Sequence, residues 1–504
     1  MKKKLKKKNT RAAPARQAYT RYAGAERSRL TADWLTAATS ANADIRRDLP
    51  LLRERARDLC GNNEFAKRFV SLLDQNVIGP KGIKLQAAVT LADETNDEQA
   101  NIEIERAFEE WSRPGQCDVT GGLSFVDCCD LALHTAAVDG ESFTRLVRGY
   151  PNDHGFALEM IDTDRIEERH AQSLPEGEIL MGIELDSWRR PRAYHVLSRH
   201  PSEGYAIKAE RARIPSAEMV HLFRRDRVGQ VRGLPWMHAI MSRLRVLGAY
   251  EEAELLAARV GACKMGFYKK TEMSEMPIIE PKKKEGERQA SEEPEDKGRL
   301  VHEAAPATFE ELPYGYDFQS FTPDHPAGNY GSFIKVGLRS VASGLNVSYS
   351  SLSNDLESLN YSSIRAGLLD ERDYWRKCQR WFVHSFVQPI YESWLMQAYL
   401  GGVIDITPEQ YLLAGIPVWQ PRGWAWVDPL KDEQAATEAL ANGLTTRTKI
   451  LAEKGEDFED TMKQLAAEQK IAGFYGVECG TGRKVPEREP ENPEREELRL
   501  VKSA

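Results

Sequence analysis

Hydrophobic residues recur every three to four positions over several stretches of this chain, which is the spacing that places them on one face of an α-helix. The N-terminal stretch with this pattern covers 48–77 and ends at the strong stop signal Gly79-Pro80. The turn-forming residues Gly61-Asn62-Asn63 can divide it into two helices. The same spacing predicts further amphipathic helices over 98–113 and 124–138.

The pattern then changes to short runs with strand composition, separated by turn residues such as Gly149, Pro151 and Pro175. These runs predict antiparallel strands at 141–149, 156–161, 178–185, 192–197 and 219–223. Helices followed by a block of strands indicate an α+β domain over roughly 48–232.

Helical periodicity returns after Pro235 and predicts one helix over 236–268, about 30 residues and on the order of 45 Å long. Its second half carries two neighbouring rows of small residues: Ala253, Ala257 and Gly261, and Ala258 and Ala262. Small residues let helix backbones approach closely. Two interpretations remain open, a tightly packed interior helix of a monomer and close packing against copies of the same chain.

The C-terminal half alternates between polar segments and helices. Residues 269–325 are highly charged and too poor in apolar residues to order themselves alone. We predict a shorter helix over 326–345, a polar loop over 346–360 and a long helix over 361–400 that Pro389 kinks or divides. Two or three short helices follow over 432–470, and both chain ends are charged and expected to be disordered.

Composition excludes several classes of protein. The chain has 504 residues and a net charge of −8, whereas tight nucleic-acid binders usually have a basic domain. No run approaches the roughly 18 apolar residues that cross a bilayer, so we expect no membrane partner. Six lysines among the first eight residues form either a solvated tail or a contact for nucleic acid or anionic lipid. We interpret the seven scattered cysteines as reduced thiols.

Candidate chemistry is sparse, because the chain has no P-loop, no G-x-S-x-G and no H-E-x-x-H motif. Two groups of carboxylates could hold magnesium in a metal-dependent nuclease: Asp127, Asp130, Asp139 and Glu141, and Asp162, Asp164, Glu167 and Glu168. Neither group has a partnered lysine or histidine at a telling spacing, so solvated turns are the favoured interpretation. We therefore expect no catalytic residue, no metal and no cofactor, and a structural or mechanical role.

Segments spread over 30–470 resemble the lambda-like family of bacteriophage portal proteins. They include Trp34, the run at 51–70, NVIGPKGIKLQ at 76–86, the helix-forming run at 233–268, NYSSIRAGLLDERDYWR at 360–376 and WAWVDPLKD at 424–432. Their joint occurrence in this order makes the resemblance specific. It implies a portal fold assembled as a ring of about twelve subunits at one capsid vertex, around a central DNA channel.

The resemblance also implies a division of the chain into the parts of a portal subunit. These are a basic arm (1–47), an α+β wing (48–235), a stem helix (236–268), a projecting clip (269–325), a second stem helix (326–345), a tunnel loop (346–360), a long wing/crown helix (361–402), a helical crown (403–470) and a charged tail (471–504). The implied partners are other copies of the chain, double-stranded DNA, the terminase large subunit, major capsid and scaffold proteins, and head-tail connector proteins. The implied location is the virion, with assembly in the host cytoplasm.

The residues expected to face DNA lie on the second stem helix and the tunnel loop. Lys335 and Arg339 are either channel-side cations or partners in salt bridges between subunits. The loop offers hydroxyls and amides for weak phosphate contacts, with two acids that limit residence: Ser348, Ser350, Ser351, Ser353, Asn354, Asp355 and Glu357. We expect Ala253, Ala257, Ala258, Gly261 and Ala262 to pack between subunits. The alternatives are the nuclease named above, or another neck or scaffold component of a virion.

Overall fold

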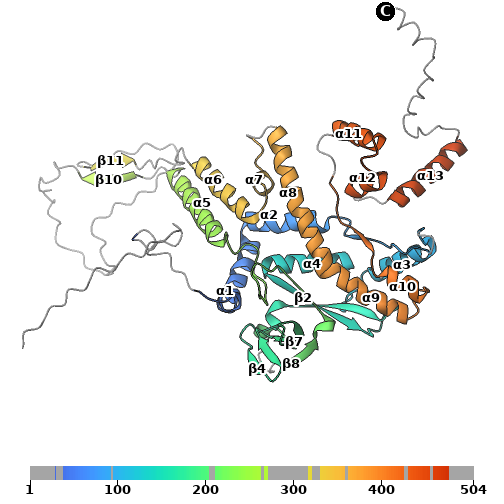
Figure 1. The fold of residues 1–504 in the computed structure, drawn as a ribbon. Coiled ribbons are helices and arrows are strands. Elements are labelled where there is room, and N and C mark those ends of the chain that lie inside the picture. Colours follow the sequence, from blue (N-terminus) through green and yellow to red (C-terminus); the bar gives the residue numbers. More distant parts are fainter. Residues whose placement is uncertain are drawn as a thin grey trace, which may run out of the picture.

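The computed structural model describes residue 29 and residues 38–91, 95–203, 210–262, 266–270, 316–320, 330–357, 361–424, 429–454 and 458–475. Within these residues the chain is a mixed α+β protein, as expected (Figure 1). Most of the predicted N-terminal arm, clip and C-terminal tail lie outside the described residues, and residues 41–47 of the predicted arm belong to a helix that continues to Asn62. No described helix is both long enough and apolar enough to cross a membrane.

The predicted helix over 48–77 begins earlier and is divided at Asn63. Helix α1 (Ala41–Asn62) starts at Ser40, whose hydroxyl accepts from the backbone N–H of Ala43 at 3.2 Å. Asn63 ends α1 and its side chain caps α2 (Glu64–Leu73), which runs on into the π-helical turn η3 (Asp74–Ile78). The other two predicted helices are α3 (Glu98–Trp111) and α4 (Phe125–Val138).

Two antiparallel sheets follow the helices. The order of the three-stranded sheet is β3 (Phe156–Ile161), β2 (Glu141–Arg148), β9 (Met219–Phe223). The five-stranded sheet contains β4 (Gln172–Leu174), β5 (Gly177–Leu180), β6 (Ile183–Leu185), β7 (Pro191–Leu197) and β8 (Arg211–Pro215), in that order. The single strand predicted over 178–185 is wrong, because Met181 and Gly182 adopt positive φ angles and turn the chain into a β5–β6 hairpin. Short 3₁₀ turns lie at Thr163–Arg165 (η4), Pro201–Glu203 (η5) and Ser216–Glu218 (η6).

A helix is present within the predicted range 236–268, but it is shorter than predicted at both ends. Helix α5 covers Met241–Ala262, and residues 266–268, predicted to be helical, belong instead to strand β10 (Gly266–Lys270). Strand β10 pairs antiparallel with β11 (Tyr316–Ser320), so the two ends of the predicted clip form a ribbon beyond the stem (Figure 1).

Helix α6 (Tyr330–Leu345) packs antiparallel against α5 at close range. A side chain at Gly337 would bring a Cβ within 2.8 Å of Leu247 Cδ2, and one at Gly344 would overlap Ile240. The rings of Tyr250 and Phe333, 5.2 Å apart, extend the contact toward the clip. The two glycines therefore set the spacing of the helix pair.

The predicted long helix over 361–400 is present as one continuous rod. It consists of α8 (Tyr361–Phe382), the π-helical turn η8 (Val383–Val387) and α9 (Gln388–Leu400), with Pro389 in the first turn of α9. Proline has no N–H to donate to the preceding turn, and the wider π turn at this point accommodates that loss. Pro389 therefore marks the position of an irregular turn without ending the helix.

The core lies beneath this rod. Trp394 of α9 is fully buried, and its ring lies 5.0 Å from that of Phe108 in α3. A smaller apolar cluster, which includes Leu49 of α1, Phe143 of β2 and Tyr194 of β7, joins α1 to both sheets. These contacts attach the rod to the α+β part of the chain.

The predicted crown falls into two parts in the structure. Helix α10 (Pro408–Ala414) and strand β12 (Val418–Gln420) pack against the wing, since β12 pairs with β1 (Lys84–Gln86) and the Tyr391 hydroxyl donates to the Ala414 carbonyl at 2.9 Å. The following segment forms three helices, α11 (Pro429–Ala441), α12 (Arg447–Lys454) and α13 (Phe458–Tyr475), in agreement with the two or three expected.

Candidate functional site

The predicted tunnel loop contains a short helix, so its description as a loop throughout is wrong. Helix α7 (Tyr349–Ser353) begins at Ser348, whose hydroxyl accepts from the Ser351 N–H at 3.2 Å. Asn346 and Asn354 have φ angles of 57° and 55° on either side of it. Asparagine tolerates this left-handed conformation better than most residues, which explains how the chain turns sharply into and out of α7.

An ion pair closes the segment 346–357 back onto the stem. Lys335 Nζ of α6 lies 3.0 Å from Asp355 Oδ2 and 3.7 Å from Glu357 Oε2. The Tyr349 hydroxyl donates to the same Asp355 oxygen at 2.8 Å. The hydrogen bonds from Lys335 and Tyr349 lower the pKa of Asp355 to about 2, and the bond to Asp355 raises the pKa of Lys335. We expected Lys335 to be a channel cation or a bridge between subunits, but this contact lies within one chain.

Arg339 lies one helical turn after Lys335 on the same face of α6. Its guanidinium carbon is 5.5 Å from the centre of the Tyr349 ring, within the range of a cation–π contact. Both predicted cations of α6 therefore contact the segment that follows their own helix.

The serine hydroxyls of this segment are used to hold it in place. Ser351 Oγ donates to Glu371 Oε2 of α8 at 2.8 Å, and Ser353 Oγ donates to the Tyr349 carbonyl at 2.7 Å. Ser348 Oγ caps α7 and lies 3.2 Å from Ser350 Oγ. These hydroxyls were expected to be spare contacts for phosphate, but the chain itself occupies them.

Three contact residues of the segment were missed by sequence reasoning: Tyr349, Glu371 and Arg68. Arg68 of α2 donates to the Ser351 carbonyl at 3.1 Å. Glu371 is only 6% exposed, and it falls between Leu368 and Trp375 on the apolar face of the long helix. The sequence could have indicated this contact, because a carboxylate at a buried helical position requires hydrogen-bond donors nearby.

The small residues of α5 lie on a surface that is open in a single chain. Ala253 and Ala258 are exposed and Ala257 is half-buried, while Gly261 and Ala262 form the last turn of α5, where side-chain exposure lies outside the description. Large apolar side chains are exposed around them on the stem: Val246 (66%), Leu255 (70%) and Leu256 (62%) on α5, and Phe333 (56%) and Val336 (64%) on α6.

The carboxylates considered for a nuclease are largely engaged by arginines. Glu141 is fully buried and bonds to Arg232 Nε at 2.7 Å, Arg53 at 3.0 Å and His221 Nε2 at 2.9 Å. Burial opposes ionisation of Glu141, yet the charge of Arg232, the bond from His221 and the charge of Arg53 bring its pKa down to about 2. Glu168 accepts from Arg53 at 2.5 Å. This network ties α1 to both sheets.

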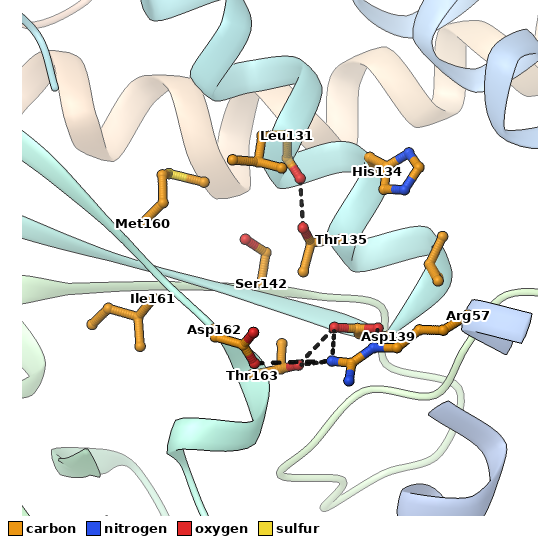
Figure 2. A pocket seen from close by; sticks show the side chains of 11 residues that line it. Arg57, Leu131, His134, Thr135, Asp139, Ser142, Met160, Ile161, Asp162 and Thr163 are labelled. Carbon is orange, nitrogen blue, oxygen red and sulfur yellow. Dashed lines mark hydrogen bonds and ion pairs between the residues drawn. The ribbon is translucent and has the colours of Figure 1, made fainter. Parts of the chain in front are cut away.

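A pocket of about 370 Å³ lies beside this network, between α4 and the edge of the three-stranded sheet (Figure 2). Arg57 crosses it, with two bonds to Asp139 at 2.7 and 2.8 Å and one to Asp164 at 2.5 Å. Arg57 also lies 3.9 Å from Asp162, the other acid that lines the pocket, and this positive charge beside both acids disfavours a metal ion there.

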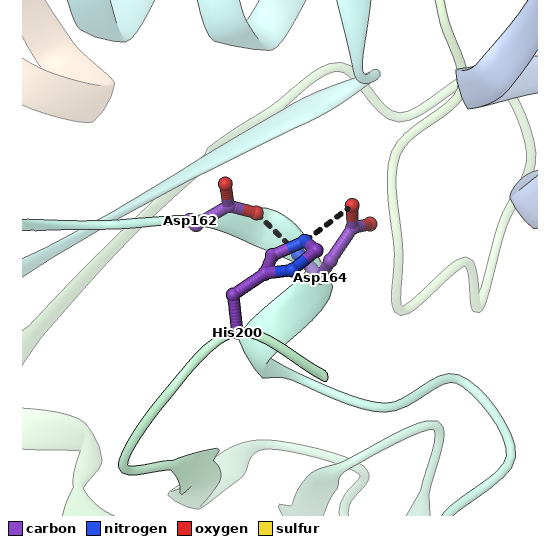
Figure 3. A group of neighbouring side chains, drawn as sticks. All are labelled: Asp162, Asp164 and His200. Atoms are coloured by element: carbon purple, nitrogen blue, oxygen red, sulfur yellow. Dashed lines mark hydrogen bonds and ion pairs between the residues drawn. The ribbon is translucent and has the colours of Figure 1, made fainter. Parts of the chain in front are cut away.

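One group in the described residues has the composition of a metal site, namely Asp162, Asp164 and His200 (Figure 3). His200 Nε2 lies 3.3 Å from Asp164 Oδ2, the oxygen that Arg57 also binds, and Asp162 Oδ1 accepts from the Asp164 N–H at 2.8 Å. These contacts explain why the three side chains lie together: they hold the start of the turn η4.

The remaining candidate acids have separate local roles. Asp127 forms a capping box with Ser124 at the start of α4, and Glu167 pairs with Arg211. Burial, with the charge of Asp127, raises the pKa of Asp130 to about 6. The structure therefore does not bring the candidate carboxylates together as an open, uncompensated cluster.

Comparison with known proteins places these observations in a family. The model of "Phage portal protein, lambda family" matches residues 27–379. The "Probable portal protein" of Halomonas phage phiHAP-1 is 35% identical over 458 residues, which cover 90% of this chain and 87% of the relative. "Portal protein B" of Escherichia phage lambda is 22% identical over 468 residues, covering 86% of each chain. Among solved structures, a chain from the neck of an empty GTA particle aligns with a TM-score of 0.43 and 14% identity, over 81% of this chain and 94% of that one.

The family match covers the α+β part, helices α5 and α6 and most of α8. The relative from Halomonas phage phiHAP-1 is similar over nearly the full length of both proteins. This chain therefore belongs to the lambda family of phage portal proteins, which are structural, non-enzymatic components of the virion.

Proposed function

We propose that about twelve copies of this chain close into a ring at one capsid vertex, and that double-stranded DNA passes through the central channel during packaging and ejection. The stem pair α5–α6 and the segment 346–357 line the channel, and α+β wings radiate outward. The rival assignments, a metal-dependent nuclease or another neck or scaffold component, have less support because the family match identifies a portal protein.

The observation that carries this proposal is the apolar outer surface of the stem. Leu255 and Val336 are 70% and 64% exposed, on helices that already pack tightly against each other. Five large apolar side chains are exposed on this helix pair, and such exposure is typical of an interaction site. In a ring, the stem of the neighbouring copy covers this surface, and the small side chains Ala253 and Ala258 let the helices approach closely.

The lining proposed for the channel is weakly adhesive for a specific reason. Affinity for DNA comes mainly from lysines and arginines that displace counterions from phosphates. Asp355 neutralises Lys335, the Tyr349 ring covers one face of Arg339, and the serine hydroxyls already have partners. With a net charge of −8 on each copy, the ring as a whole repels phosphate.

The remaining proposed partners follow from which part of the subunit would face outward and which would face the capsid. The clip, 269–325, projects from the stem and meets the terminase large subunit during packaging and head-tail connector proteins afterwards. Major capsid and scaffold proteins contact the wing and crown, in the host cytoplasm during assembly. The antiparallel β10–β11 ribbon supports a projecting clip, because it holds the two ends of this segment side by side at the end of the stem.

Electron microscopy of the purified protein tests the proposal. We expect closed rings with a central pore wide enough for a DNA duplex, and native mass spectrometry should give one dominant multiple of the subunit mass. Particles that stay monomeric and without a pore, under conditions in which circular dichroism shows folded protein, would refute the ring.

A further inference from the structure

A basic pocket of about 170 Å³ lies where β1, β12 and α12 meet. Four of its lining residues are cationic: Lys81, Lys84, Arg422 and Lys454. The other lining residues are glycines, prolines, Ile78 and Gln420, so none of the described lining residues carries a carboxylate. Figure 1 shows α12 well away from α5 and α6, so this pocket is separate from the proposed channel lining.

The fold brings three of these cations together at one end of a two-stranded ribbon. Lys84 of β1 lies opposite Gln420 of β12, and Arg422 follows β12 by two residues. Gly79, with a φ angle of 76°, ends η3 and packs directly under Arg422, where an added Cβ would lie 2.9 Å from the Arg422 side chain. The close approach at Gly79 positions the guanidinium at the pocket.

Arg422 is held by neutral groups. Its guanidinium donates to the Gln75 carbonyl and to Asn76 Oδ1, and its own carbonyl accepts from Gln379 at 3.0 Å. Burial without a compensating anion lowers the pKa of Arg422. The guanidinium therefore has a fixed direction and an uncompensated charge within the described part of the chain.

Three cations of this pocket differ from other cations of the chain in having no carboxylate partner among the described residues. Arg53, Arg57, Arg232 and Lys335 each form ion pairs with carboxylates at 3.0 Å or less. Across the residues that the structure describes, no such pair is found for Lys81, Lys84 or Arg422. These three cationic residues line one pocket and have no ion pair among the described residues, which favours an anion from outside.

Further positive charge lies next to the pocket. The guanidinium carbons of Arg372 and Arg376, on α8, are 6.0 and 5.8 Å from the centre of the Trp424 ring. Trp424 Nε1 donates to Asn76 Oδ1 at 3.0 Å, the same oxygen that Arg422 contacts. Two arginines of α8 thus lie near the pocket through Trp424, although Asp373 pairs with Arg376 at 2.8 Å.

We propose that this pocket binds a phosphodiester group of double-stranded DNA outside the channel. A guanidinium fork and flexible lysines suit phosphate oxygens, and such contacts do not depend on base sequence. The pocket's own lining has no aromatic ring on which a base could stack, which favours a backbone phosphate over a nucleobase. The proposal rests on the proposed function in that it requires DNA to reach the ring, and each copy would contribute one such site.

The test compares two double variants with equal charge change. Lys81→Gln/Lys84→Gln removes two exposed cations of the pocket, and Lys67→Gln/Lys470→Gln removes two exposed lysines elsewhere. Binding of preassembled rings to closed circular DNA is measured at several salt concentrations, because a closed circle has no end to thread through the channel. We expect the pocket variant to bind DNA about tenfold more weakly than the wild-type protein. The slope of log binding constant against log salt concentration should become shallower by about one for each lysine that contacts a phosphate.

The outcomes separate this inference from the proposed function. Equal binding of the pocket and control variants, in rings that form normally, would refute the phosphate site and leave the portal ring intact. Failure of the wild-type protein to form rings would refute the proposed function instead. A second experiment measures the binding of inorganic phosphate alone by calorimetry. If the pocket variant loses phosphate binding but keeps DNA binding, the pocket binds free phosphate and the assignment to DNA is wrong.

Discussion

Lys335 of α6 and Asp355, which follows α7, form an ion pair of 3.0 Å that fastens the proposed tunnel segment to its own stem. The pair is partly exposed, so salt and solvent weaken it, but Tyr349 adds a second hydrogen bond to the same carboxylate oxygen. In the proposed channel, this local closure would decide which charges of the segment remain available to DNA.

The first prediction concerns the pH dependence of this closure. The pKa of Asp355 is lowered from an ordinary value of 3.8 to about 2, so the ion pair contributes stability above pH 3.8 and loses it as the pH falls toward 2. Asp355→Asn should lower hydrogen-exchange protection factors across 346–357 at neutral pH, and this difference from wild type should vanish near pH 2. Asp373→Asn, which alters an exposed pair within α8, should leave 346–357 unchanged. A difference that persists at pH 2 would contradict the assignment.

The second prediction separates closure from repulsion of DNA. Glu357 is 88% exposed and lies 3.7 Å from Lys335, so in the proposed channel it contributes negative charge at the surface. Glu357→Lys should slow DNA packaging in vitro while rings still form, because the added cation prolongs contact with phosphate. Glu357→Gln is the graded control and should have a smaller effect. An unchanged packaging rate in the lysine variant would reject a non-adhesive lining at this position.

The third prediction concerns the buried network of the wing. Removing one partner of a buried ion pair leaves an uncompensated charge, so Glu141→Gln should lower the free energy of unfolding by about 3–5 kcal/mol. Glu178→Gln is a suitable control, because its pair with Arg189 is exposed and should be worth at most about 1 kcal/mol. Urea denaturation measures both. If the two variants lower the free energy of unfolding by similar amounts, the buried network adds little to stability.

The fourth prediction concerns packing between copies. Gly261→Leu places a large side chain on the small-residue row of α5, and overpacking should impair ring assembly. Gly61→Leu, on α1 at a position with open space around it, serves as the comparison away from the stem. Native mass spectrometry counts the subunits. Normal rings from Gly261→Leu would show that this row does not lie between copies.

Regular elements were largely predictable because their signals are local. The five strand-forming runs and the long helix depend on residue composition and spacing within each run, and the structure has strands or helix at each of them. The hairpin at Met181 was not predictable in this way, since methionine gives no sign of a positive φ angle. The strands β1 and β12 were missed because they are short and pair across most of the sequence.

The candidate site was predictable in position but not in its contacts. Sequence reasoning selected Lys335, Asp355 and the serines from their residue types and the family resemblance. Their partners depend on a one-turn helix that two asparagines in left-handed conformation make possible, and on Glu371 and Arg68 from distant segments. Contacts of this kind arise from tertiary packing, which spacing along the chain does not encode.

The rod formed by α8, η8 and α9 has a mechanical consequence. Near its start, Glu371 holds Ser351 of the tunnel segment, and toward its other end Trp394 is embedded in the aromatic core of the wing. Because α8, η8 and α9 follow one another without a break, one continuous helical element links these two anchor points. In the proposed ring, a load applied to the outer body of a subunit would thus be passed along this helix toward the bore.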